Sequence, residues 1–215
     1  MISLSKTYEQ SIVAGLRARG YVEYPDGAWL TLGVDDINLI VQPRIKITAQ
    51  NAWFEFGLGI RFGKVEEAFA NAMEVASPKT SSTLGCDMAH LLKIPGASGW
   101  SYLVSSLDVH AVQGEMLERL DMLAAPELEL YSSYAALSSL VHARLSKNRR
   151  DPFIFREHHY IPIVLLMNRE QELYEKYISE KLAELHKLNA SGETSMEVGY
   201  RKYVKALEFQ LHNSS

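Results

Sequence analysis

The sequence predicts an α+β fold in which an antiparallel meander sheet of four to five strands packs with helices and a C-terminal helical segment follows. Strand signals fall in the first half of the 215 residues, whereas apolar residues recur with a period near 3.6 from Asp108 onward. Such grouping is typical of α+β proteins rather than of the alternation that builds parallel sheets. The strongest strand signal is residues 51–62, where every second residue is large and apolar. These apolar positions are Phe54, Phe56, Leu58, Ile60 and Phe62.

The first half should begin with a helix and continue as the meander. Residues 4–19 repeat apolar groups at helical spacing and end before Gly20, a residue that tolerates the left-handed conformation of a helix cap. Apolar residues four apart over 65–73 predict a second helix after the main strand. Residues 86–93 suit a short helix as well as a strand, and we prefer the strand. Residues 21–23 begin an extended region, and the expected strands are residues 29–34, 37–43, 51–62, 86–93 and 100–104.

The second half should be helical to its end. Pro162 should kink a helix or mark its start, and residues 194–197 form a capping box before the last helix. The expected helices are residues 109–123, 126–145 with Pro126 in the first turn, about 155–167, 170–188 and one that follows the capping box. We divide the chain into a sheet domain, residues 1–107, and a helical segment, residues 108–215. The two should pack as one compact unit with a weak boundary near 148–152.

Composition narrows the class of protein. With 47% hydrophobic and 22% charged residues, the chain can form a substantial core. A net charge of -4 argues against binding to nucleic acid. The single cysteine, Cys86, excludes an internal disulfide and fits a reducing cytoplasm. The longest apolar run, residues 161–167, is too short to span a membrane, and the N-terminus lacks a signal-peptide pattern. We therefore expect a cytoplasmic protein without membrane contact.

No motif of high specificity for catalysis or for a cofactor occurs. Gly57, Gly59 and Gly63 resemble a dinucleotide fingerprint, but two of them lie inside the strand and the third is one residue late. Their simpler role is to leave one strand face flat, so that a helix or another chain approaches closely. The seven histidines lack a zinc-binding pattern, so no metal is expected. His158 and His159 would point about 100° apart on a helix, one buried and one exposed.

Acidic and aromatic residues of the sheet are the candidates for partner contacts. Asp35 and Asp36 join two strands, where a carboxylate pair could serve acid–base chemistry or bind a hard cation. Aspartate is also a common hairpin-turn residue, which is the interpretation we favour. Trp53 and Glu55 alternate with the phenylalanines and so lie on the opposite face. Trp53 is either covered by a helix or open to a partner, for which tryptophan is a frequent anchor.

Four segments, LRARGYVEYPDGAWLTLG, VDDINLIVQPRI, WFEFGLGI and HHYIPIVLLMNREQELYEKYISEKL, carry a family resemblance. They resemble a group of bacterial α+β domains of unknown function that includes immunity proteins of polymorphic and contact-delivered toxins. The resemblance covers most of the chain and is weaker beyond Arg150. It implies a non-enzymatic cytoplasmic protein that neutralises a cognate toxin by direct binding, and it carries no catalytic residues over.

The leading hypothesis is therefore a protein-binding module that meets a basic, nuclease-like surface of its partner. Its expected contacts are Asp35, Asp36, Trp53 and Glu55. The alternative from another class is a small hydrolase or transferase that uses His158, His159 and nearby carboxylates. A homodimer built through the late helices is a third hypothesis.

Overall fold

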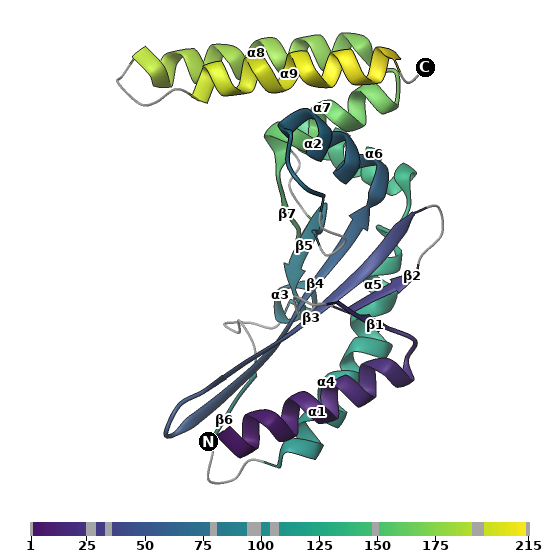
Figure 1. The fold of residues 1–215 in the computed structure, drawn as a ribbon, viewed down its shortest axis with the longest axis vertical. Coiled ribbons are helices and arrows are strands. Elements are labelled where there is room, and N and C mark those ends of the chain that lie inside the picture. The colour runs from purple at the N-terminus through teal and green to yellow at the C-terminus, as the bar shows by residue number, and fades with distance from the viewer. Residues whose placement is uncertain are drawn as a thin grey trace.

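The computed structural model of the chain describes residues 2–24, 29–32, 36–77, 81–93, 100–103, 108–147, 151–190 and 196–213. The described strands form one antiparallel sheet in the order β1-β2-β3-β4-β5-β7, and β6 pairs with β4 off this path (Figure 1). This arrangement confirms the predicted α+β class. The strands are β1 (Val22–Glu23), β2 (Trp29–Leu32), β3 (Ile37–Ile47), β4 (Asn51–Phe62), β5 (Leu84–Asp87), β6 (Trp100–Leu103) and β7 (Ile154–Phe155).

Helices gather at both ends of the sheet (Figure 1). α1 and α4 lie together at one end, and α8 and α9 lie side by side at the other. Of the predicted features, residues 194 and 195 of the capping box and residues 148–150 of the boundary lie outside the described residues. The helices are α1 (Ile2–Ala18), α2 (Gly63–Met73), α3 (Met88–Leu91), α4 (Val109–Arg119), the π-helical turn η2 (Leu120–Ala124), α5 (Ala125–Glu129), α6 (Tyr134–Leu145), α7 (Glu157–Met167), α8 (Gln171–Ala190) and α9 (Met196–Asn213).

Strand β4 organises the sheet. Every residue of β3 pairs with β4, from Ile37 opposite Phe62 to Ile47 opposite Ala52. Along the other edge of β4, β6 pairs with its first four residues, and β5 pairs with residues 57–60. The two intervening residues of β4 therefore have no neighbour on that edge among the described strands.

The phenylalanine face of β4 is the core, as the alternation predicts. Phe54, Phe56 and Phe62 are fully buried. Tyr8 of α1 covers Phe54 with its ring centroid 4.5 Å away, and Tyr134 of α6 covers Phe62 at 5.3 Å. One apolar cluster continues from these residues through α2, α7 and α9. Residues on both sides of the predicted boundary thus belong to the same core.

Two short elements differ from the sequence prediction. Residues 86–93, predicted as a strand, divide after Asp87, where β5 ends and α3 begins. Met88 and Leu91 are buried at a spacing that one helical turn places on the same side. The second half, predicted to be purely helical, contains β7, which pairs with β5 through its two residues. Two residues are too few to show a period of two.

The helix predicted over 109–123 is longer in the structure, because α4 continues through η2 into α5. The next helix, predicted to start near Pro126, begins at Tyr134; Pro126 instead lies in the first turn of α5, and the side chain of Leu130 is largely exposed. Ser133 sets this start, since its hydroxyl accepts a hydrogen bond from a backbone N–H in the first turn at 3.0 Å. The remaining predicted helices are present as α7, α8 and α9, and Pro162 lies inside α7.

Candidate functional site

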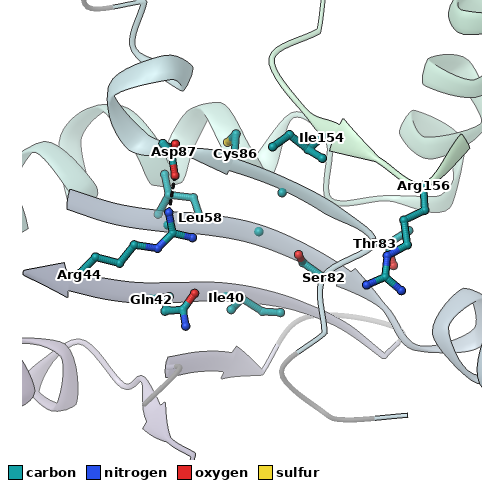
Figure 2. Close-up of a pocket in the computed structure, with 13 residues that line it drawn as sticks. Ile40, Gln42, Arg44, Leu58, Ser82, Thr83, Cys86, Asp87, Ile154 and Arg156 are labelled. Carbon is teal, nitrogen blue, oxygen red and sulfur yellow. Dashed lines mark hydrogen bonds and ion pairs between the residues drawn. The ribbon is translucent and has the colours of Figure 1, made fainter. Parts of the chain in front are cut away.

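The face of β4 opposite the phenylalanines carries a groove of about 390 Å³ (Figure 2). Gly57 and Gly59 lie in its floor, and Gly85 of β5 pairs directly with Gly59. Because three neighbouring positions in two strands lack side chains, the sheet surface is hollow where other residues would fill it. Arg44 and Arg156 lie at opposite ends of this groove (Figure 2).

The side chain of Arg44 crosses β4 above Gly57. Its Nη1 donates a hydrogen bond to Oδ1 of Asp87 at 2.7 Å, so the ion pair joins β3 to β5 over the intervening strand. A Cβ atom on Gly57 would lie 2.5 Å from Nη2 of Arg44. Glycine is therefore needed for this path, and any larger residue would displace the guanidinium. Both partners are nearly half exposed, so the pair contributes little to stability.

Ser82 forms the opposite wall of the groove. A Cβ atom on Gly59 would lie 2.7 Å from the Cβ of Ser82, and one on Gly85 would lie 3.1 Å from the Ser82 hydroxyl. The glycines were predicted to admit a helix or another chain. What approaches them in the structure is Arg44 and the loop that contains Ser82.

Buried Glu66 of α2 holds that loop in place. Its Oε1 accepts a hydrogen bond from the Thr83 hydroxyl at 2.7 Å, and its Oε2 accepts one from the Ser81 hydroxyl at 2.9 Å. Arg61 of β4 donates to the hydroxyls of Ser81 and Ser77, each at 3.0 Å, and its Nη1 lies 3.8 Å from Glu66 Oε2. This buried ion pair is satisfied by loop hydroxyls, so the groove wall is tied to both the sheet and α2.

Arg156 follows β7 and lies in the wall between the groove and a second hollow of about 560 Å³. Its guanidinium lies 5.6 Å from the centroid of the Phe69 ring. Within the part of the chain that the structure describes, no carboxylate forms an ion pair with this exposed side chain. We call this second cavity the aromatic hollow. It is lined by Phe69, Phe155, Arg156, Glu157, His158 and His159.

The two adjacent histidines differ in their surroundings, as predicted. His158 is exposed, whereas His159 is half-buried. The ring of His159 contacts the rings of Phe69 and Tyr203 at centroid distances of 5.3 and 5.0 Å. Burial and the neighbouring positive groups lower the pKa of His159, so its ring is neutral near pH 7.

Asp36 has a structural task that the turn interpretation did not include. It has a positive φ of 64°, and its Oδ2 accepts a hydrogen bond from the backbone N–H of Lys64 at 2.7 Å. This contact caps the N-terminus of α2 from outside the helix. The Tyr134 hydroxyl also donates to Asp36 Oδ1, at 3.1 Å. Asp36 is exposed, but both of its carboxylate oxygens accept hydrogen bonds within the protein. Asp35 lies outside the described residues.

Glu55, expected to be a surface contact, is completely buried. It occupies the stretch of the β4 edge between β5 and β6, where its Oε1 accepts a hydrogen bond from the backbone N–H of Phe56 at 3.0 Å. Its Oε2 has no hydrogen-bond partner in the described part of the chain. Burial raises the pKa of Glu55 to about 7, although backbone N–H groups, foremost that of Ala89, oppose this rise.

Trp53 is half-buried and lies on the same face of β4 as the groove. The register places it opposite Lys46 of β3 and Ser101 of β6. Among the described residues, it is the one expected contact that combines partial exposure with no side-chain hydrogen bond or ion pair.

Sequence reasoning missed Arg44 and Arg156. A signal for Arg44 was present, because Gln42, Arg44 and Lys46 alternate as polar residues on β3 and all are exposed. Arg156 had no comparable signal. Its position depends on the pairing of β7 with β5, an element from a distant part of the chain.

The groups around the groove suit the binding of an anion. Guanidinium, amide and hydroxyl donors face it from Arg44, Arg156, Gln42 and Ser82. Burial raises the pKa of the nearby Cys86 thiol to about 12, so the reactive thiolate does not form at neutral pH. Within the described residues, no group of three or more histidines, cysteines or carboxylates could hold a metal ion.

Comparisons of the chain with protein-family models, with curated proteins and with solved structures gave no match. The resemblance to immunity proteins therefore stays a prediction. None of the described helices combines the length and the apolar composition that crossing a membrane requires.

Proposed function

We propose that the protein is a non-enzymatic binding protein that receives an anionic group of a protein partner in the groove. The observation that carries this proposal is Arg156, an exposed guanidinium without a carboxylate partner in the described part of the chain, at the junction of two hollows. A guanidinium binds carboxylates and phosphates through two parallel hydrogen bonds. The groove thus offers local positive charge on a protein whose net charge is -4.

Binding is favoured over catalysis by the state of the nearby reactive groups. Ser82 and Thr83 line the groove. No hydrogen bond links the Ser82 hydroxyl to a histidine or carboxylate among the described residues, and the Thr83 hydroxyl is buried in its bond to Glu66. An unactivated serine is a weak nucleophile. The hydrolase alternative would need His158 or His159 as a base, and the ring of His159 is packed among aromatic side chains.

Titration with sodium pyrophosphate tests whether the groove accepts an anion. We expect the backbone amide NMR signals of Gly57, Gly59 and Gly85 to shift on addition of pyrophosphate. Arg156→Gln should weaken the apparent affinity about tenfold, because the remaining arginine is already paired with Asp87. Arg169→Gln is the matched control, since Arg169 is an exposed arginine outside both hollows. Equal affinity of the Arg156 variant and the wild type would refute the proposal.

Within this class of binding proteins, we propose neutralisation of a cognate toxin as the biological role, on the basis of the sequence resemblance. Trp53 is then the first contact residue to test, because Glu55 is buried and Asp36 caps a helix. Titration of a co-encoded toxin should give a complex at micromolar concentration, and Trp53→Ala should weaken it. Absence of any complex at that concentration would end the toxin hypothesis and leave the anion test unaffected.

A further inference from the structure

The groove and the aromatic hollow share Arg156 as a lining residue. Ile154 lines the groove, Phe155 lines the hollow, and Arg156 lines both. Alternation along β7 explains this division, because successive residues of a strand point to opposite sides. A ligand bound to the guanidinium can therefore reach both cavities at once.

The aromatic hollow has the chemistry of a site for an aromatic ring. Phe69 and Phe155 supply aromatic surface, and His159 meets Phe69 edge-on with their planes inclined by 74°. Arg156 already packs its guanidinium against Phe69. Aromatic rings favour such edge contacts with one another, and they bind guanidinium groups over their faces.

An exposed apolar residue beside the groove indicates a protein partner instead of a small free anion. Ile154 is 79% exposed, although it lies in a strand that pairs with the sheet. β7 is also the last strand in the sheet order, so its outer edge has no neighbouring strand among the described residues. Exposed strand edges bind extended segments of other chains, and specificity then comes from the pockets beside them.

We infer that the groove receives an extended partner segment in which an acidic residue and an aromatic residue are adjacent. The carboxylate lies on Arg156, and the aromatic ring enters the hollow between Phe69 and His158. This inference rests on the proposed function, because it names the partner chemistry for the same site.

Three blocked tetrapeptides test the inference: Gly-Asp-Phe-Gly, Gly-Asp-Ala-Gly and Gly-Asn-Phe-Gly. Each is titrated into the full chain while the amide signals of the three floor glycines are followed. We expect Gly-Asp-Phe-Gly to bind at least about fivefold more tightly than either of the other two peptides. Phenyl phosphate and pyrophosphate are titrated in parallel, so that small anions are compared with the peptide.

Two variants test which part of the peptide binds in which cavity. Arg156→Gln should weaken Gly-Asp-Phe-Gly and Gly-Asp-Ala-Gly alike. His158→Ala should weaken the two peptides that contain phenylalanine and leave Gly-Asp-Ala-Gly unchanged. It is preferred to a Phe69 variant because His158 is exposed, whereas Phe69 is half-buried and packs against the core. Arg169→Gln again serves as the control.

The outcomes separate this inference from the proposed function. Equal binding of the Asp-Phe and Asp-Ala peptides would overturn the inference and leave the anion site standing. If Gly-Asn-Phe-Gly bound as tightly as Gly-Asp-Phe-Gly, the carboxylate would not be needed, and the role that the inference gives to Arg156 would be wrong. Binding of phenyl phosphate without binding of any peptide would show a small-molecule site, which also overturns it. If pyrophosphate too leaves the glycine signals unchanged, both the inference and the proposed function are wrong.

Discussion

Glu55 lies in the gap that β5 and β6 leave along the edge of β4. At this place no neighbouring strand among the described residues offers a carbonyl to the backbone N–H of Phe56. The side chain of Glu55 folds back and accepts that hydrogen bond instead. A carboxyl group satisfies the backbone here at the cost of its own desolvation. Protonation reduces that cost, which is why burial raises the pKa of Glu55 to about 7.

Glu55→Gln should remove a pH dependence of stability. In wild type, the unfolded chain releases the Glu55 proton near pH 4.5, whereas the folded chain keeps it until about pH 7. The free energy of unfolding therefore falls as the pH rises between these values, by up to about 3 kcal/mol from this group. Glutamine keeps the hydrogen-bond acceptor but does not ionise. Urea unfolding at pH 4.5, 6 and 8 should show the variant gaining stability relative to wild type as the pH rises.

Glu118→Gln is the control for that measurement, since Glu118 is an exposed glutamate of α4. Its difference from wild type should stay nearly constant over the same pH range. If the Glu55 difference were equally flat, the Glu55 carboxyl would titrate alike in the folded and unfolded chains, and the structural account of its burial would be wrong.

At the scale of elements, the N-terminus of α2 is capped by a residue from another part of the chain. The N-cap position, Phe62, makes no side-chain cap bond, and Asp36 supplies the acceptor from the β3 side of the sheet. Gly63 allows this approach, because a Cβ atom there would lie 2.4 Å from Asp36 Oδ2. The hairpin and the helix are thus joined by one carboxylate.

Asp36→Ala should destabilise the protein by about 1 to 2 kcal/mol, through loss of the cap and through strain of alanine at a positive φ. Asp36→Asn should retain most of the stability, because asparagine tolerates the left-handed conformation and keeps an acceptor oxygen. Urea unfolding of both variants measures the difference. An alanine variant as stable as the asparagine variant would be inconsistent with a capping role.

The loop at residues 81–83 depends on Thr83 more than on Ser82. The Thr83 hydroxyl donates to Glu66 and accepts from the backbone N–H of Phe62 at 3.1 Å. Thr83→Val keeps the shape but leaves both groups without a buried partner, which should cost about 1 to 3 kcal/mol. Ser82→Ala removes a half-buried groove hydroxyl, which has no buried partner group among the described residues, and should change stability by less than about 0.5 kcal/mol. Thermal unfolding of the two variants compares them, and the opposite order would disprove this account of the loop.

Element length determined how well the sequence predicted the fold. Residues 51–62 are long enough to show their alternation, and β4 has those bounds in the structure. β7 and α3 are two and four residues long, shorter than either period needs, and pairing and burial decide them instead. The same limit applies to the candidate site. Its glycines were visible in the sequence, but Arg156 lines the same groove only because β7 pairs with β5.

At the scale of the whole molecule, the two faces of β4 serve different purposes. The phenylalanine face joins α1, α4 and α6 to the sheet, and its apolar cluster extends into α2, α7 and α9. The opposite face holds the groove on a glycine floor. Since Glu66 of α2 holds the loop that forms one groove wall and α7 begins directly after Arg156, helical packing positions the end of the groove opposite Arg44.

Leu207→Ala tests whether the sheet and the late helices unfold together. Leu207 of α9 is fully buried, and its truncation should cost about 2 to 5 kcal/mol. All three tryptophans lie within residues 1–107, so their fluorescence reports on the sheet, while far-UV circular dichroism reports mainly on the helices. Because one apolar cluster spans both parts, the two urea midpoints should coincide in wild type and shift equally in the variant. Lys205→Ala, an exposed change in the same helix, should move neither midpoint. A shift in circular dichroism with unchanged fluorescence would instead mean that the helical segment unfolds separately from the sheet.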